Sequence, residues 1–223
     1  MKENLVVDFD STWVKVETLD VVADLALKGR EDKADILQQV AEITKQGMEG
    51  KIPFDESLQR RLALFSATQE HFQTAAQHLQ SQVTPSFARN RDFIEENSSR
   101  VYIVSGGFTD CIDPVAREFG IPRAHIHANL LRFDRQGKLL GVMDTPAARA
   151  GGKTEAVKGL NLKGETIVVG DGMTDYQIKE SGAADKFYAF TENVSRPPVL
   201  KVADVGVANF EEILEALAEK RES

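Results

Sequence analysis

Polar residues that could carry out chemistry follow three short runs of strand-forming residues. Asp8 and Asp10 follow the first run, Ser105 follows the second, and Asp171 follows the third. Such apolar runs are typical of buried parallel strands, whose carboxyl ends meet at one edge of a sheet. We therefore expect these four side chains to share one crevice, with Asp175 close to its rim.

Three of these side chains are carboxylates, which repel one another when they are crowded together. A hard cation among Asp8, Asp10 and Asp171 would remove this repulsion. Mg²⁺ fits such a site because it prefers oxygen ligands, keeps several water molecules and binds substrate phosphate oxygens. The sequence therefore predicts Mg²⁺ as the cofactor and phosphoryl transfer as the chemistry, with Asp175 in a supporting position.

The two N-terminal aspartates are suited to different steps of such a reaction. Asp8 ends a strand, where its carboxylate can be aimed at phosphorus and can attack it to form an aspartyl-phosphate. Asp10 can protonate the departing alkoxide and later deprotonate the water that cleaves the acyl-phosphate. We predict that Asp8 is the nucleophile and that Asp10 is the acid and base.

Two further segments could hold the phosphate group. Ser105 is followed by Gly106 and Gly107, whose backbone amides could bind phosphate oxygens at the start of the next helix. Lys153 lies at the start of another expected helix and could neutralise both the nucleophile and the phosphoryl group. These four residues are the predicted phosphate-binding residues, and Lys153 is also predicted to take part in catalysis.

The elements that must position these residues predict an α/β fold. Strands alternate with helices along most of the chain, which is the pattern of a doubly wound, Rossmann-like parallel sheet. Between residues 15 and 83 strand signals are nearly absent and apolar residues recur at helical spacing. We therefore expect a catalytic core of residues 1–14 and 84–223, with a small four-helix cap domain of residues 15–83 inserted after the first strand.

Glycine, proline and helix-capping residues indicate where these elements begin and end. The four inserted helices are expected at about 16–28, 31–49, 54–64 and 68–82. In the core we expect helices at 84–97, 109–119, 151–159, 175–182 and 209–220, short strands at 186–190 and 205–207, and a hairpin within 124–143.

Taken in order, four segments resemble the motifs of the haloacid-dehalogenase-type phosphatases with a helical C1-type cap. These segments are Asp8–Thr12, Ser105–Gly107, Lys153 and Gly170–Asp175. The resemblance covers nearly the whole chain and places the helical insert where this family has its cap. It implies that Asp8 is the nucleophile and that the metal is held by Asp8, Asp171 and the backbone carbonyl of Asp10.

The helical insert resembles that of the phosphoserine phosphatases within this family. By that resemblance, Glu17 would meet the substrate ammonium group and Arg61 its carboxylate, while Met48 and Phe54 would line the pocket. Arginine suits a carboxylate because it can donate two parallel hydrogen bonds. Thr174, where the family usually has Asn, is a further expected substrate-binding residue. The implied reaction is hydrolysis of O-phospho-L-serine to serine and phosphate, the final step of serine biosynthesis.

Trp13 replaces a smaller aliphatic residue that is common at this position in the family. We therefore expect the entrance to the cap to be shaped differently here.

Two alternatives remain open. Another capped member of the same family, such as a phosphoserine:homoserine phosphotransferase or a phosphatase of a different small metabolite, would carry the same core motifs. Receiver domains also combine a phosphorylatable Asp, acidic magnesium ligands and a Lys, but they act as switches rather than enzymes. Asp10, as a proton donor, and the insert of residues 15–83 favour an enzyme.

The composition limits the remaining possibilities. The 223 residues include 42% hydrophobic residues and carry a net charge of −8, which is typical of a globular protein but not of a general nucleic-acid or membrane-surface binder. The expected partner is a small phosphomonoester. One cysteine, Cys111, excludes an intrachain disulfide. The N-terminal residues form no apolar signal region, and we expect a cytoplasmic protein whose oligomeric state the sequence leaves open.

Overall fold

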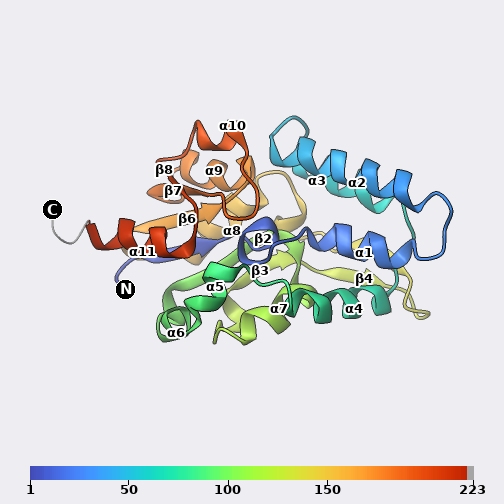
Figure 1. The fold of residues 1–223 in the computed structure, drawn as a ribbon, viewed down its shortest axis with the longest axis horizontal. Helices are drawn as coiled ribbons and strands as arrows, with labels where there is room; N and C mark the ends of the chain where they lie inside the picture. Colours follow the sequence, from blue (N-terminus) through green and yellow to red (C-terminus); the bar gives the residue numbers. More distant parts are fainter. Residues whose placement is uncertain (220–223) are drawn as a thin grey trace.

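The computed structural model describes residues 1–219 and contains the predicted parallel sheet (Figure 1). The strand order in this six-stranded sheet is β3-β2-β1-β6-β7-β8, and every neighbouring pair is parallel. The chain thus adds strands first on one side of β1 and then on the other. The strands are β1 (Asn4–Val7), β2 (Val101–Phe108), β3 (Ile126–Asn129), β6 (Thr166–Gly170), β7 (Lys186–Phe190) and β8 (Val205–Val207).

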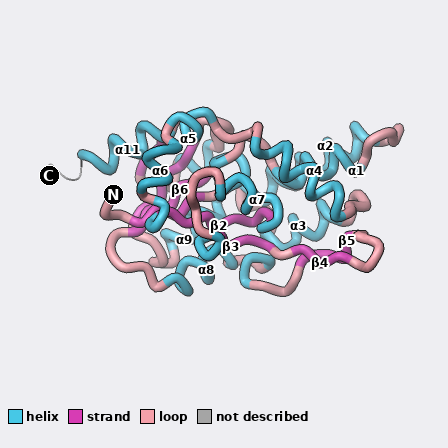
Figure 2. The backbone as a smooth tube through the Cα atoms, turned by 90° about the horizontal axis from the view of Figure 1, so that it is seen from below, coloured by secondary structure: helices cyan, strands magenta, loops and turns pink. Residues whose placement is uncertain are grey.

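Side chains of the central strand alternate between two apolar layers. Leu5 and Val7 are buried in one layer, whereas Val6 is buried in the other. Because helices cover both faces of the sheet (Figure 2), its strands carry continuous apolar runs. The first layer includes α5 (Pro85–Arg89), α6 (Arg91–Glu96), α7 (Thr109–Arg117) and α11 (Phe210–Glu219), and the second includes α8 (Gly152–Leu160), α9 (Met173–Glu180) and α10 (Pro197–Leu200).

Four of the six α-helices between β1 and β2 form a group of their own, between the turn after β1 and α5. In α2 (Lys33–Met48) the buried apolar residues Ile36, Val40 and Ile43 recur every three or four positions, so this helix turns one apolar stripe inward. The four helices lie at the end of the molecule away from α11 (Figure 1). We refer to residues 15–83 as the helical insert. Its helices are α1 (Thr18–Ala26), α2 (Lys33–Met48), α3 (Phe54–Leu62) and α4 (Gln69–Gln80).

The chain enters and leaves the helical insert at adjacent points. Val14 and Val83 form an antiparallel bridge. The backbone amide of Thr84 donates a hydrogen bond to the Trp13 carbonyl at 2.9 Å. The two connections therefore form a short antiparallel ribbon beside the carboxyl end of β1.

The single helix predicted for residues 84–97 is wrong, because the structure has two short helices there. Asn90 separates them with a φ of −100° and a ψ of 21°. Its side-chain amide donates to the Ser86 carbonyl at 2.8 Å and to Glu211 Oε1 at 2.9 Å. A side-chain hydrogen bond to a nearby backbone carbonyl competes with the hydrogen bonds of the helix, which favours an interruption at Asn90. The second bond, to Glu211, connects this interruption to α11.

Residues 124–143 form more than the predicted hairpin. Ile126–Asn129 is β3, the edge strand of the main sheet, and the separate antiparallel hairpin consists of β4 (Leu131–Phe133) and β5 (Leu139–Val142). Only Leu130 separates β3 from β4, so no turn residue marks the boundary in the sequence.

Short 3₁₀ turns occupy Ser98–Arg100, Arg123–His125 and Pro146–Ala148.

The Trp13 backbone lies where the chain enters the helical insert, but its side chain is buried in the core and lines no opening, so the expectation that it shapes an entrance is wrong. The side chain is 0% exposed, and its ring centroid lies 4.9 Å from that of Phe87 and 5.2 Å from that of Phe119. It fills the apolar layer beneath α5, where a large ring gains more from burial than it would at a solvent-exposed entrance.

Two further observations complete the fold. The last predicted helix, 209–220, corresponds to α11, although residue 220 lies outside the described residues. Within residues 1–219, the helices lack the combination of length and hydropathy that crossing a bilayer requires.

Candidate active site

The carboxyl ends of β1 and its two neighbours bring three predicted residues together. Asp8 directly follows β1, Asp171 directly follows β6, and Ser105 lies in the last part of β2. Each of these residues is 2% exposed. The Asp8 amide still donates to the Val169 carbonyl, at 2.9 Å, so the sheet holds the backbone at this point. The site thus lies where the strand order reverses, which is where open α/β sheets bind ligands.

Immediately beyond Asp8 the backbone turns sharply over Phe9–Trp13. Ser11 has a φ of 56°, in the left-handed region that few residues other than glycine adopt. Asp8 Oδ1 accepts a hydrogen bond from the next backbone amide at 2.7 Å, and the Asn193 side chain donates to the Ser11 carbonyl at 3.1 Å. These contacts hold the turn so that the side chains of Asp10 and Ser11 meet residues at the start of α1.

Lys153 lies between two buried carboxylates. It belongs to the first turn of α8, and its Nζ is 2.9 Å from Asp8 Oδ1 and 2.7 Å from Asp175 Oδ1. Burial alone would lower the pKa of this lysine, but Asp175 and Asp8 outweigh burial and raise the pKa above its ordinary value. Lys153 is therefore a fixed cation beside the predicted nucleophile.

Asp8, Asp171 and Asp175 form a cluster of buried carboxylates. One oxygen from each lies within 4.8 Å of the others. Burial, opposed by Arg196, raises the pKa of Asp171 to about 7, while burial and the nearby Asp8 raise that of Asp175 to about 8. The crowded negative charges are thus only partly balanced by the cations of the protein.

The donor atoms of this cluster suit a magnesium ion. Asp171 Oδ2 accepts a hydrogen bond from Arg196 Nε at 2.9 Å, but its Oδ1 is buried and has no hydrogen-bond partner within residues 1–219. An unpaired buried carboxylate oxygen is costly, and oxygen atoms are the ligands that Mg²⁺ prefers. The residues present therefore fit the predicted ion.

Asp10 is held differently from the carboxylate cluster. Its Oδ1 accepts hydrogen bonds from the Thr18 backbone amide, at 3.1 Å, and from the Thr18 hydroxyl. Burial, followed by the charges of Glu17 and Asp8, raises the pKa of Asp10 well above its ordinary value. The Asp10 carboxylate lies outside the cluster of three, so a metal contact from this residue would use the backbone carbonyl.

The predicted phosphate-binding residues of β2 line the same pocket as Asp8 and Asp10. The Gly107 amide donates to Ser105 Oγ at 3.0 Å. A Cβ atom on Gly107 would lie 3.2 Å from Asp10 Oδ2, and one on Gly106 would lie 2.5 Å from the Phe54 ring. Glycine at these two positions lets the backbone approach both Asp10 and the helical insert closely. The structure places these residues in β2 rather than after it, which corrects the predicted strand end.

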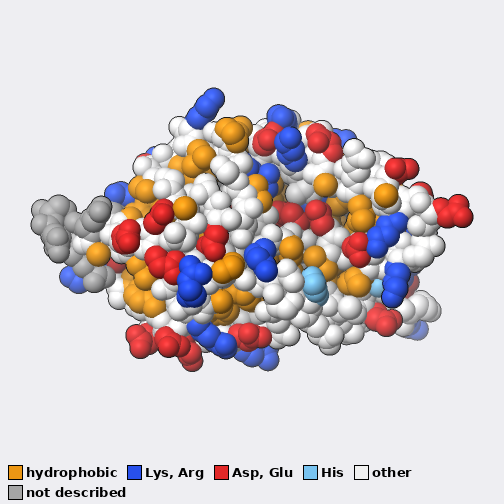
Figure 3. Space-filling view, viewed as in Figure 1, with side chains coloured by type: hydrophobic (Ala, Val, Ile, Leu, Met, Phe, Trp, Pro, Cys, Tyr) orange, Lys and Arg blue, Asp and Glu red, His pale blue; other side chains and the backbone are white. Residues whose placement is uncertain are grey.

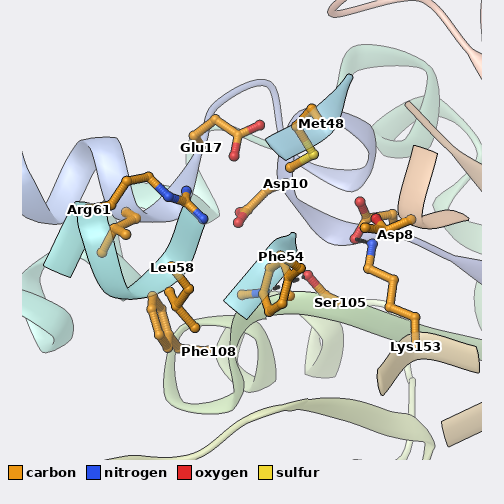
Figure 4. A pocket seen from close by; sticks show the side chains of 14 residues that line it. Asp8, Asp10, Glu17, Met48, Phe54, Leu58, Arg61, Ser105, Phe108 and Lys153 are labelled. Carbon is orange, nitrogen blue, oxygen red and sulfur yellow. Dashed lines mark hydrogen bonds and ion pairs between the residues drawn. The ribbon is translucent and has the colours of Figure 1, made fainter. Parts of the chain in front are cut away.

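One pocket brings together the core residues and the residues predicted from the helical insert (Figure 4). Thr174, from the first turn of α9, lies in this lining, whereas Asp171 and Asp175 lie outside it, next to Asp8 and Lys153. The pocket is lined by Asp8, Asp10, Glu17, Leu19, Met48, Phe54, Leu58, Arg61, Ser105, Gly106, Gly107, Phe108, Lys153 and Thr174.

The helical insert contributes two charged side chains of opposite sign. Arg61 is 5% exposed, and it donates to Thr44 Oγ1 at 3.2 Å through Nη1 and to the Ser57 carbonyl at 3.3 Å through Nε. Glu17 Oε1 accepts a hydrogen bond from Ser11 Oγ at 2.6 Å. Figure 4 shows both head groups directed into the pocket, and the described residues contain no ion pair between them.

Burial perturbs both of these charges. It raises the pKa of Glu17 and lowers that of Arg61, and the attraction between the two residues opposes each shift. Asp20 also opposes the shift of Arg61, and one Asp20 oxygen is buried without a hydrogen-bond partner in the part of the chain described. This end of the pocket therefore contains charges that are not fully compensated.

Several residues of the site were missed from the sequence, among them Leu19, Leu58 and Phe108 of the pocket lining and the contacting residues Thr18, Asn193 and Arg196. Thr18 directly follows Glu17 at the start of a helix, and its only signal was the preference of Thr for helix N-termini. Asn193 and Arg196 lie in the loop after β7, which has no recognisable motif. Their roles depend on the tertiary approach of this loop to the ends of β1 and β6.

Charge outside the site is mixed in sign. Figure 3 shows acidic and basic side chains interspersed on one face of the molecule. Exposed ion pairs such as Arg30–Asp32 and Arg89–Glu211 also bring opposite charges together at the surface. On this face, positive charge is therefore not concentrated in a broad patch.

Comparison with known proteins places this site in a family. The family model of haloacid dehalogenase-like hydrolases matches residues 5–180. The phosphoserine phosphatase of Bos taurus is 34% identical over 216 residues, which cover 95% of this chain and 92% of that protein.

Solved structures agree with this similarity. The crystal structure of a phosphoserine phosphohydrolase-like protein from Francisella tularensis subsp. tularensis SCHU S4 has a TM-score of 0.87 at 30% identity, covering 96% of this chain and 99% of that chain. A phospho-aspartyl intermediate analogue of phosphoserine phosphatase has a TM-score of 0.77 at 29% identity, covering 97% and 99%. The chain belongs to the haloacid dehalogenase-like hydrolase family and, within it, is a relative of the phosphoserine phosphatases.

Proposed function

We propose that this protein is a magnesium-dependent phosphatase that hydrolyses O-phospho-L-serine to L-serine and phosphate. The observation that carries the proposal is the composition of one pocket, in which Asp8 and Lys153 lie at one end and Glu17 and Arg61 lie at the other. A phosphorylated amino acid has the matching groups: a phosphate, an ammonium group and a carboxylate. Serine biosynthesis is the process that this reaction would serve.

In the first step, an Asp8 carboxylate oxygen attacks phosphorus. The bond between phosphorus and the serine oxygen breaks as the bond to Asp8 forms, which leaves an aspartyl-phosphate. Lys153 and the Phe9 amide hold Asp8 Oδ1 and so orient the carboxylate for attack. Asp10, whose raised pKa favours the protonated form, gives its proton to the departing serine oxygen.

In the second step, a water molecule attacks phosphorus and displaces Asp8. Asp10, now deprotonated, takes a proton from this water and is thereby restored. The Ser105 hydroxyl and the neighbouring backbone amides would hold the phosphate oxygens, and Lys153 would stabilise their negative charge in both steps. Phosphate then leaves with Asp8 and Asp10 in their starting forms.

Asp8, Asp171 and the backbone carbonyl of Asp10 would hold Mg²⁺, with Asp175 in support. When bound, the ion would offset the charge of the phosphate oxygens and of the crowded carboxylates. The unpaired Oδ1 of Asp171 supports this assignment, because it is a buried acceptor without a donor among residues 1–219. Arg196 would keep the Asp171 carboxylate in one orientation through the other oxygen.

Substrate recognition would depend on the helical insert. Glu17 would accept hydrogen bonds from the ammonium group, and Arg61 would donate to the carboxylate. Thr44 and Ser57 already hold the Arg61 guanidinium, so little side-chain freedom is lost on binding. Met48, Phe54 and Thr174 would enclose the short serine side chain.

The domain division belongs to the same proposal. Residues 15–83 would act as the cap, and residues 1–14 and 84–223 as the catalytic core. The adjacent entry and exit points at Val14 and Val83 support this division. A cytoplasmic location and the lack of nucleic-acid and membrane partners stay predictions from the sequence.

The test is phosphate release from a panel of phosphomonoesters in the presence of Mg²⁺. We expect kcat/KM for phosphoserine to exceed that for glucose 6-phosphate by at least about two orders of magnitude, because only phosphoserine supplies partners for both Glu17 and Arg61. Comparable values would contradict the substrate, while the phosphatase chemistry would stand. Formation of phosphohomoserine when homoserine is added would instead support a phosphotransferase.

A further inference from the structure

β2 and β3 pair irregularly beside the pocket. Val104 lies opposite His127, and the next pair is Phe108 opposite Asn129. Ser105–Gly107 of β2 therefore lies opposite a single residue of β3. Extra residues in one strand of a pair form a bulge, which bends the strand and redirects its side chains. This bulge lines the end of the pocket that contains Asp8 and Lys153, which we call the phosphate end.

A bulge interrupts the hydrogen bonds of the sheet, so its backbone groups need other partners. The side chain of Asn129 supplies one of them, because its Nδ2 donates to the Gly106 carbonyl at 2.8 Å. Asn129 is 0% exposed and does not line the pocket. Asn129 thus contacts the bulge from the neighbouring edge strand β3, outside the pocket lining.

The bond to Gly106 also determines where the Gly107 amide points. The Gly106 carbonyl and the Gly107 N–H belong to one planar trans peptide group, so they point in opposite directions. With its carbonyl bound to Asn129, this peptide group directs its N–H to Ser105 Oγ at 3.0 Å. A continuous chain of two hydrogen bonds therefore runs from Asn129 to the Ser105 hydroxyl.

We propose that Asn129 is a positioning residue for phosphate binding, acting through the Gly106–Gly107 peptide group on the Ser105 hydroxyl. The inference rests on the proposed function in one respect, since it takes the phosphate group as the ligand of Ser105. Asn129 does not line the pocket, so it would act on bound phosphate only through this peptide group. Its loss should therefore weaken binding of every phosphomonoester to a similar degree.

The test compares Asn129→Ala with Asn4→Ala in the full chain with Mg²⁺. Asn4 is a matched control because it is also a buried asparagine, 4% exposed, whose Nδ2 donates to a backbone carbonyl, that of Lys163 at 3.0 Å. It lies at the start of β1, away from the carboxyl ends that form the site. Both variants should lower the midpoint of thermal unfolding.

We expect Asn129→Ala to raise the inhibition constant of orthophosphate and the KM of both phosphoserine and p-nitrophenyl phosphate by about three- to tenfold, the range of one lost hydrogen bond. Asn4→Ala should leave all three constants within about twofold of the wild type, because it removes a hydrogen bond of the same kind elsewhere. Unchanged constants in Asn129→Ala, or an equal rise in Asn4→Ala, would overturn the inference.

Asn129→Ser serves as the second variant if the alanine variant does not fold. Its hydroxyl is too short to reach the Gly106 carbonyl, so the same rise in the constants is expected, and wild-type constants would overturn the inference. Failure of the proposed function is a separate result. It would appear as an absence of phosphate release by the wild-type protein, whereas failure of this inference leaves wild-type turnover intact.

Discussion

The two ends of the pocket differ in how their charges are balanced. At the phosphate end, Lys153 forms ion pairs with Asp8 and Asp175 at 2.9 and 2.7 Å. At the other end, Glu17 and Arg61 are held by uncharged groups of the protein and form no ion pair with each other within residues 1–219. At the first end the protein pairs part of its own charge, whereas the second end leaves two opposite charges for a substrate to pair.

This difference separates chemistry from selectivity. Substitutions at the phosphate end should affect every phosphomonoester, because they change the reacting groups. Substitutions of Glu17 and Arg61 should affect only substrates that carry an amino-acid head group. The following predictions can contradict or sharpen this contrast.

The largest effect is expected for Asp8→Asn. An amide is a very poor nucleophile, so kcat should fall by at least about four orders of magnitude for both phosphoserine and p-nitrophenyl phosphate. Phosphate release measures the loss, and an unchanged thermal unfolding midpoint would show that the variant is folded. Turnover close to that of the wild type would refute the aspartyl-phosphate mechanism.

Removal of divalent cations with a chelator should abolish turnover of all substrates, and added Mg²⁺ should restore it. Asp171→Asn should raise the Mg²⁺ concentration required for half-maximal activity by at least about tenfold, because a neutral amide is a weaker ligand than a carboxylate. Asp144→Asn is the control, since Asp144 is 79% exposed and lies outside the site. Activity that is insensitive to the chelator would exclude the proposed cofactor.

Arg61→Gln tests the amino-acid end. The kcat/KM for phosphoserine should fall by about a hundredfold, because a carboxylate would be buried without its cation, while p-nitrophenyl phosphate should change by less than about threefold. Arg60→Gln is the matched control, because Arg60 is the neighbouring residue of α3 and is exposed in an ion pair with Glu56. Equal losses for the two substrates would remove the distinction between the ends of the pocket.

Ser11→Ala should have the smallest effect. Ser11 Oγ orients Glu17, and loss of this bond should raise the KM for phosphoserine by about threefold while leaving p-nitrophenyl phosphate unchanged. Steady-state kinetics with the two substrates measure the difference. A matching change for both substrates would mean that Ser11 acts through the Asp8 turn instead of through Glu17.

The main fold and the phosphate end could be predicted because they leave local signals. Asp8 and Asp171 each follow a run of buried strand residues, where a charge requires a specific partner. Lys153 could be placed only through its order relative to those motifs. The helical insert was visible as a long region with helical periodicity.

Other features depend on contacts between distant segments and leave no local signal. Asn129 binds a backbone carbonyl of another strand, and Arg196 reaches Asp171 from a loop that follows a different strand. Trp13 was misplaced because its aromatic neighbours, Phe87 and Phe119, come from later parts of the chain. Hydrogen bonds from a side chain to a backbone carbonyl are especially hard to predict, because every residue has a backbone carbonyl and its residue type therefore gives no signal.

The antiparallel ribbon at the base of the helical insert has a consequence for how such proteins can diversify. Besides the Val14–Val83 bridge, the Lys15 amide donates to the Gln82 carbonyl at 2.8 Å, so the two connections are already joined. A segment whose ends lie this close can be exchanged for another of different length at little cost in chain entropy. New substrate selectivity could therefore arise by replacing one continuous stretch of the gene, with the phosphate chemistry inherited unchanged.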